Sequence, residues 1–161
     1  MMPSDQPHTR SPARQTLSFD AFALVHLEEQ CRRVQALYEQ ACRECPGPTF
    51  EGTHWRLLCE VRAHFAELVR SWLVKHHRLL PSALPEIGQP LDSQGTHATP
   101  PHRLIATLAH EERVLREACE TALRGNLPPD VRQQIDLQRR AIDLQLRDLA
   151  TRPEALVPAA I

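Results

Sequence analysis

Apolar residues recur every three or four positions in four long segments of the chain, which proline and glycine separate. This spacing is typical of helices that bury one face. The segments run from about 18 to 45, 50 to 79, 100 to 125 and 128 to 152. In the second segment, the residues that we expect to face the core are Leu58, Val61, Phe65, Leu68 and Trp72.

The ends of these segments predict how the helices are joined. Ser18 can cap the first helix, and Gly125 follows the third, where glycine often takes a left-handed conformation. The breaks at 46–48 and 125–129 are short, so each joins antiparallel neighbours, while the break at about 81–99 can cross the bundle. The sequence therefore predicts an all-α, antiparallel four-helix bundle of ferritin-like type, with one long connection between helices two and three.

The length of 161 residues suits one domain. We expect the bundle to occupy residues 17–152. Residues 1–16 and 153–161 carry no apolar stripe and are polar or rich in proline, so we expect them to be disordered tails.

Charge and composition narrow the possible partners. The chain has 19 Lys and Arg against 20 Asp and Glu, and only 4% of it is aromatic. It therefore lacks the basic field and the stacking side chains of a nucleic-acid-binding protein. No apolar run is long enough to span a membrane, and the first residues lack a signal-peptide pattern. We expect a cytoplasmic protein that binds neither nucleic acid nor membrane.

Several polar residues fall in or beside the apolar stripes, where burial requires a partner. Either Glu111 or Glu112 fills a missing apolar position, and Gln35, Gln138 and Gln145 occupy or flank core positions. This polar layer could be a metal or proton-relay site, or a hydrogen-bonded or hydrated layer, which we prefer. We expect Glu112 to point inward without a cation, hydrogen-bonded to Gln138 or to water, so that Glu112→Gln slightly stabilises the protein.

The candidate metal ligands are Glu60, His64 and Glu112. Glu60 and His64 are one helical turn apart, so both could reach one ion. A di-iron bundle needs ligands from all four helices, and the fourth segment contains no histidine. We therefore expect no cofactor, with iron or zinc as the alternative.

The chain has five cysteines, which we interpret as reduced thiols of an intracellular protein. Cys42 and Cys45 have the spacing of half a zinc site, but no second such pair follows. Both lie in a helical pattern, where cysteine acts as a small apolar residue. A redox sensor would need one of them to be an exposed, acidic thiol.

Residues of the last two segments resemble a bacterial family of small ferritin-like four-helix-bundle proteins of unknown function. The most specific part is the turn Leu127-Pro128-Pro129-Asp130-Val131-Arg132. The other matching positions are Glu112, Ala122-Leu123, Gln138, Tyr38-x-x-Ala41 and Glu67-Leu68.

The resemblance implies the fold more than a reaction. It places the family's third-helix glutamate at Glu112. Gln35 stands where the family has an acidic residue, and Leu146 where it has a histidine. These departures remove metal ligands, so the resemblance does not carry metal binding over to this chain.

We find no phosphate-binding glycine loop and no nucleophile elbow in the sequence. We therefore expect a non-enzymatic bundle that acts by self-association or by binding a protein partner. A metal-binding ferritin-like protein and a cysteine-based redox sensor are the alternatives.

Overall fold

The computed structural model describes residues 18–44, 50–78 and 101–152. The predicted all-α class is confirmed, because these residues form four helices and no strand. The predicted tails lie outside the described residues. The helices are α1 (Phe19–Glu44), α2 (Phe50–His77), α3 (Pro101–Leu123) and α4 (Pro129–Thr151).

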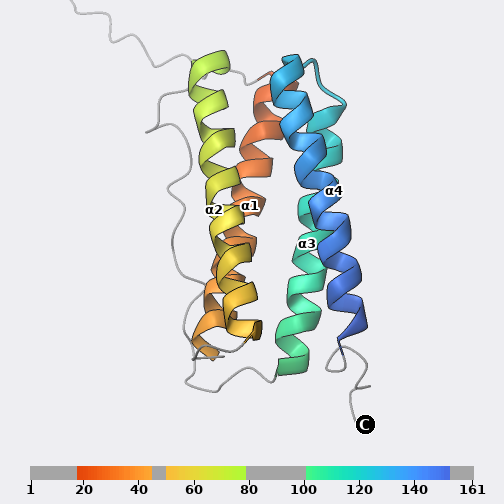
Figure 1. The fold of residues 1–161 in the computed structure, drawn as a ribbon. Helices are drawn as coiled ribbons and strands as arrows, with labels where there is room; N and C mark the ends of the chain where they lie inside the picture. Colours follow the sequence, from red (N-terminus) through yellow and green to blue (C-terminus); the bar gives the residue numbers. More distant parts are fainter. Residues whose placement is uncertain (1–17, 45–49, 79–100, 153–161) are drawn as a thin grey trace, which may run out of the picture.

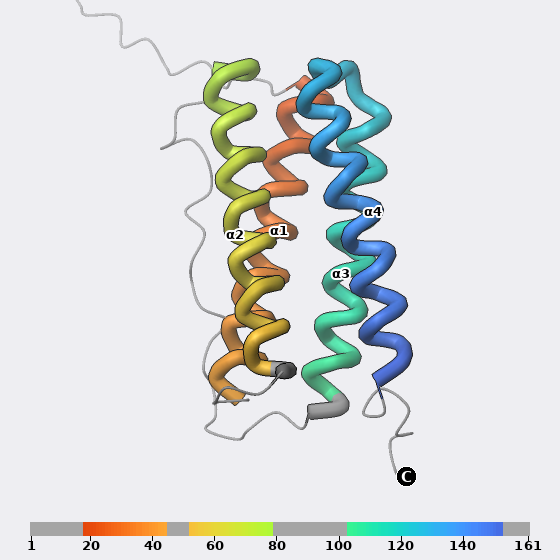
Figure 2. Tube along the Cα trace, in the orientation of Figure 1, coloured from red at the N-terminus to blue at the C-terminus, as the bar shows by residue number. Residues whose placement is uncertain are grey.

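The helices form one bundle in which α2 and α4 lie in front of α1 and α3 (Figure 1). In the same view, α1 and α4 run downward along the chain and α2 and α3 run upward (Figure 2). Residues 79–100 therefore connect the upper end of α2 to the lower end of α3. Helix α1 packs closely against α2 and α3, and α3 packs against α4.

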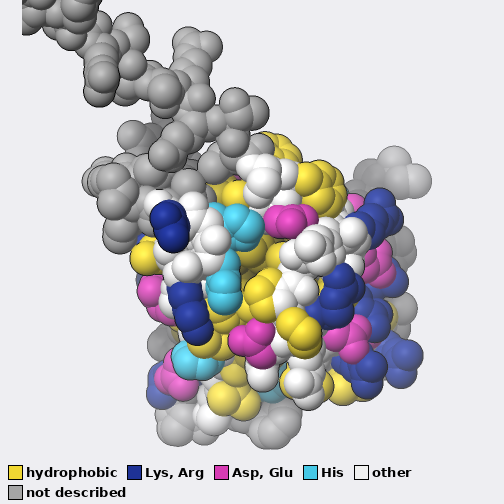
Figure 3. Space-filling model, turned by 90° about the horizontal axis from the view of Figure 1, so that it is seen from above, with side chains coloured by type: hydrophobic (Ala, Val, Ile, Leu, Met, Phe, Trp, Pro, Cys, Tyr) yellow, Lys and Arg dark blue, Asp and Glu magenta, His cyan; other side chains and the backbone are white. Residues whose placement is uncertain are grey.

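The core consists of the apolar stripes of all four helices. Seen from above, hydrophobic side chains show between the helices, while most Lys and Arg side chains lie toward the outer edge (Figure 3). The predicted stripe of α2 is only partly correct. Phe65 and Trp72 are buried, but Leu58, Val61 and Leu68 are half-buried. The most buried face of α2 carries Arg62, Ala66, Val69 and Leu73 and points into the bundle, where Arg62 reaches Glu112 of α3 and Gln138 of α4.

Two residues of the first turn of α1 hold its end in place. The Ser18 hydroxyl accepts a hydrogen bond from the Ala21 N–H at 3.2 Å, as expected of a capping serine. The Asp20 carboxylate accepts one from the Asn126 N–H at 3.1 Å and so ties α1 to the α3–α4 turn.

The expectation that Gly125 is left-handed is wrong, because its φ lies outside that region. Glycine leaves room here for the Asp20 carboxylate, which a Cβ atom at this position would displace. Arg132 closes the same turn by donating to the Leu123 and Gly125 carbonyls, each at 2.7 Å. The left-handed residue is instead Arg78, which ends α2 with a φ of 51°.

Candidate functional site

Four polar side chains meet inside the bundle, and each helix supplies one. Arg62 of α2 and Glu112 of α3 are both buried. Arg62 Nη2 donates to the two Glu112 oxygens at 2.9 and 3.0 Å, and Nε donates to Oε1 at 3.2 Å. Tyr38 of α1 donates to Glu112 Oε1 at 2.6 Å, and Arg62 Nη1 donates to Gln138 Oε1 of α4 at 3.4 Å. We call these four residues the buried charged cluster.

The side chains of the buried charged cluster can be buried because they pair with one another. Burial opposes the charge on Arg62, but the adjacent Glu112 carboxylate outweighs it and raises the pKa of Arg62. Burial is the largest cause that raises the pKa of Tyr38, and the Glu112 carboxylate raises it further. The hydroxyl therefore keeps its proton and donates a hydrogen bond to that carboxylate. Glu112 points inward as expected, and Glu111 is buried as well. The expectation that Glu112 lacks a cation is wrong, because Arg62 is its cation.

The structure does not bring the three candidate metal ligands together. Glu60 and His64 are exposed on α2, whereas Glu112 is buried and both its oxygens are engaged by Arg62. Among residues 18–44, 50–78 and 101–152, no group of three or more His, Cys, Asp or Glu side chains could hold an ion. Helical spacing identified Glu60 and His64 as neighbours, but they face away from Glu112.

The three glutamines of the predicted polar layer occupy different places. Gln138 is half-buried and joins the buried charged cluster. Gln35 is half-buried at the α1–α2 contact, where it bonds to Arg32 at 3.4 Å and Glu39 at 2.9 Å. Gln145 is buried, and its Nε2 has no hydrogen-bond partner in the described part of the chain. The glutamines therefore do not form one layer.

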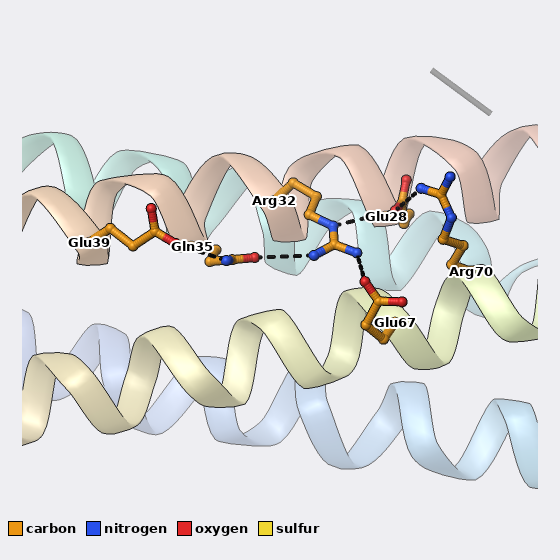
Figure 4. A network of polar contacts seen from close by, with 6 residues as sticks. All are labelled: Glu28, Arg32, Gln35, Glu39, Glu67 and Arg70. Atoms are coloured by element: carbon orange, nitrogen blue, oxygen red, sulfur yellow. Dashed lines mark hydrogen bonds and ion pairs between the residues drawn. The ribbon is translucent and has the colours of Figure 1, made fainter. Parts of the chain in front are cut away.

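A second charged network runs along the contact between α1 and α2 (Figure 4). Its centre is Glu28, which is fully buried. Glu28 Oε1 accepts from Arg32 Nε at 3.5 Å and from Arg70 Nη1 at 3.3 Å. Arg32 also pairs with Glu67 across the two helices. These pairs join α1 to α2 over about one helical turn.

The sequence analysis missed Arg62 and Glu28, the central residues of the two networks. A signal for each was present in the helical spacing. Arg62 follows Leu58 by four positions and precedes Phe65 by three, and Glu28 follows Leu24 by four. Charged residues at such positions are buried only when they are paired. Their spacing could have identified both as core residues that need partners.

The cysteines of the described residues are free thiols. Cys31 and Cys119 are buried in the core. Cys42 is half-buried, and Cys45 lies outside the described residues. Burial, followed by Glu39, raises the pKa of Cys59 to about 11, and burial raises that of Cys119 to about 12. The pKa values of Cys31, Cys59 and Cys119 are therefore raised, whereas a sensor thiol uses a lowered pKa.

The side of the bundle formed by α2 and α4 is less closely packed than the others. The other neighbouring helices pack closely, but α2 and α4 do not. Long side chains bridge them instead. Arg62 reaches Gln138, His54 Nε2 lies 3.6 Å from Asp148 Oδ2, and the Arg152 guanidinium lies 4.3 Å from the centroid of the Trp55 ring.

Large apolar side chains are exposed on both helices of this side. Leu57 of α2 is 56% exposed, and Leu137 and Leu144 of α4 are 49% and 64% exposed. At about 100° per residue, Leu57 lies roughly 140° around α2 from Arg70, which contacts α1. Leu144 lies about 100° around α4 from Asp143, which contacts α3. We call the surface formed by Leu57, Leu137 and Leu144 the open edge.

Comparisons with family models, curated proteins and solved structures find no match to this chain. A search of the described helices finds none with the length and apolar character needed to cross a membrane. The open edge and the buried charged cluster are therefore the features of the molecule that bear on its function.

Proposed function

We propose that this protein is a non-enzymatic, cytoplasmic helical bundle that acts by self-association or by binding a protein partner through its open edge. The observation that carries the proposal is the exposure of Leu57, Leu137 and Leu144 along two helices that do not pack closely on each other. Burying exposed leucine is favourable by roughly 25 cal/mol for each Å² removed from water.

The charged side chains in the bundle core support a binding role rather than chemistry. Arg62, Glu112 and Tyr38 satisfy one another and are shielded from solvent, so they offer no free base or nucleophile to a substrate. Their pairing holds α1, α2 and α3 to one another at one point. The open edge is thereby presented on a fixed scaffold.

The antiparallel, ferritin-like topology is part of this proposal, and it is supported by the helix directions and the long connection from α2 to α3. The resemblance of the last two helices to a bacterial ferritin-like family supports it as well. Iron or zinc binding is the alternative that the sequence suggests. No group of side chains in the described residues favours that alternative.

The test compares the wild type with a variant in which Leu57, Leu137 and Leu144 are all serine. Phe22→Ser serves as the control, because Phe22 is 63% exposed but lies on α1. We expect the wild type to assemble, either with itself or with a partner whose complex re-forms from purified components. The triple variant should lose the assembly, and the control should keep it. An assembly that is indifferent to the three leucines, or no assembly at all, would refute the proposed function.

A further inference from the structure

We propose that the open edge binds a second copy of this chain, related by a two-fold axis parallel to the helices. This symmetry lays α2 of each subunit over α4 of the other. The proposal rests on the proposed function and specifies it, because it names the partner and the contacts. The proposal is supported by the heights of residues on the two helices, that is, by their positions along the bundle axis. Apolar residues of α2 and α4 lie at matching heights, and so do charged residues.

The heights follow from the contact between Arg62 and Gln138, which fixes α2 relative to α4. Helices rise about 1.5 Å per residue. Leu57 precedes Arg62 by five residues, and Leu144 follows Gln138 by six. Because the two helices run in opposite directions, both leucines lie about 8 Å from that contact toward the same end of the bundle.

A two-fold axis parallel to the helices leaves these heights unchanged. Leu57 therefore meets Leu144 of the partner subunit, and the symmetry repeats the same contact on the other side of the axis. These are two of the most exposed apolar side chains in the described part of the molecule. Self-complementarity of this kind is what an isologous dimer interface requires.

The charged rim of the open edge matches in the same way. Glu60 lies two residues before Arg62, and Arg140 lies two residues after Gln138, so both are about 3 Å from the fixed contact. Glu60 and Arg140 are exposed, and Arg140 also pairs with Asp136 of its own helix at 2.7 Å. The parallel axis brings Glu60 opposite Arg140 of the partner subunit, which gives two opposite-charge contacts for each dimer.

The charges also distinguish this arrangement from the other symmetric one. A two-fold axis perpendicular to the helices would lay α4 over α4, with Leu137 against Leu144 of the partner subunit. Arg140 would then lie near the axis and close to Arg140 of the partner subunit. Like charges placed together suppress association, so the charge pattern favours the parallel axis.

The area of this face is sufficient for a dimer. Helix α4 has 23 residues, so it is about 35 Å long. Two neighbouring helices cover a width of about 20 Å, which gives about 700 Å² for each subunit. The total of about 1,400 Å² falls in the range of specific protein interfaces.

The test is a charge exchange followed by sedimentation of the full chain over a range of concentrations. We expect the wild type to sediment with twice the 18.3 kDa mass of one chain. Glu60→Arg and Arg140→Glu should each raise the dimer dissociation constant by about tenfold or more, and the double variant should restore it to within about threefold. Leu144→Asp should give a monomer, and Phe22→Asp should not. Circular dichroism of every variant checks that it is folded.

Three outcomes would overturn the proposal. If the wild type is monomeric at about 100 µM, a second copy of the chain is excluded as the partner. Binding of a different protein would still be tested by the variant in which the three leucines are serine. A dimer that Leu144→Asp leaves intact removes the open edge as its interface and contradicts the proposed function as well. A dimer that Leu144→Asp abolishes, but that the charge exchange does not restore, leaves the proposed function standing and excludes this symmetry.

Discussion

Replacing Glu112 by glutamine tests whether the buried charged cluster holds a true ion pair. Glutamine keeps the shape of glutamate and one carbonyl acceptor but carries no charge. Arg62 is 1% exposed, so its charge would stay buried without a counter-ion. The glutamine amide would also direct its N–H groups at Arg62 Nη2, which now donates to both carboxylate oxygens.

The magnitude follows from what the substitution removes. Glu112 accepts three contacts from Arg62 and one from Tyr38. Removing one partner of a buried ion pair typically costs 3–5 kcal/mol, roughly, because the other charge is left uncompensated. Since glutamine keeps one acceptor, we expect the lower end of that range, a loss of about 3 kcal/mol in the free energy of unfolding.

The measurement is urea unfolding at pH 7, followed by circular dichroism. With a slope of about 2 kcal/mol per molar urea, a loss of about 3 kcal/mol lowers the midpoint by about 1.5 M. Glu111→Gln is the matched control, because Glu111 is also buried but pairs with Arg33, which is 54% exposed and stays solvated when the pair is removed. The free energy of unfolding of that variant should fall by less than about 1 kcal/mol. If Glu112→Gln loses no more than its control, the ion-pair argument is refuted.

A second variant separates the pair from simple packing. Replacing the charges together, as Arg62→Met with Glu112→Leu and Tyr38→Phe, leaves no orphaned charge or hydroxyl. Such replacements of buried ion pairs are often neutral or stabilising. We expect the triple variant to recover most of the stability that Glu112→Gln loses. A triple variant less stable than Glu112→Gln would contradict this account.

Three further predictions concern single residues. Tyr38 is the only tyrosine of the chain, so ultraviolet titration reports on it alone. The folded protein should show no tyrosinate absorbance at pH 11, because the pKa of Tyr38 is raised. In the urea-unfolded protein the tyrosine should titrate near 10. Gly125→Ala should lower the free energy of unfolding by about 1–2 kcal/mol in urea melts, because the new Cβ collides with the Asp20 carboxylate. In an Asp20→Ala background, the same substitution should lower the free energy of unfolding by less. Arg78→Gly should stabilise the protein by up to about 1 kcal/mol in thermal melts, because its φ of 51° suits glycine; a lower melting temperature would contradict this.

The sequence by itself determined the number and approximate limits of the helices. Apolar spacing and the stops at proline and glycine are local features, and a helix forms from local hydrogen bonds. The capping role of Ser18 was predictable for the same reason, because its partner is three residues away. The inward position of Glu112 was also predicted, since the phase of α3 depends only on its own pattern.

Only the tertiary structure decided which groups meet across helices. Arg62 lies 50 residues from Glu112, and helical spacing on α2 cannot tell which carboxylate its long side chain will reach. The rotation of α2 about its own axis was equally a result of packing, because apolar residues lie on more than one of its faces and the neighbouring helices decide which are buried. Leu57 of α2 and Leu137 and Leu144 of α4 stand exposed along the open edge, on two helices that do not pack closely on each other.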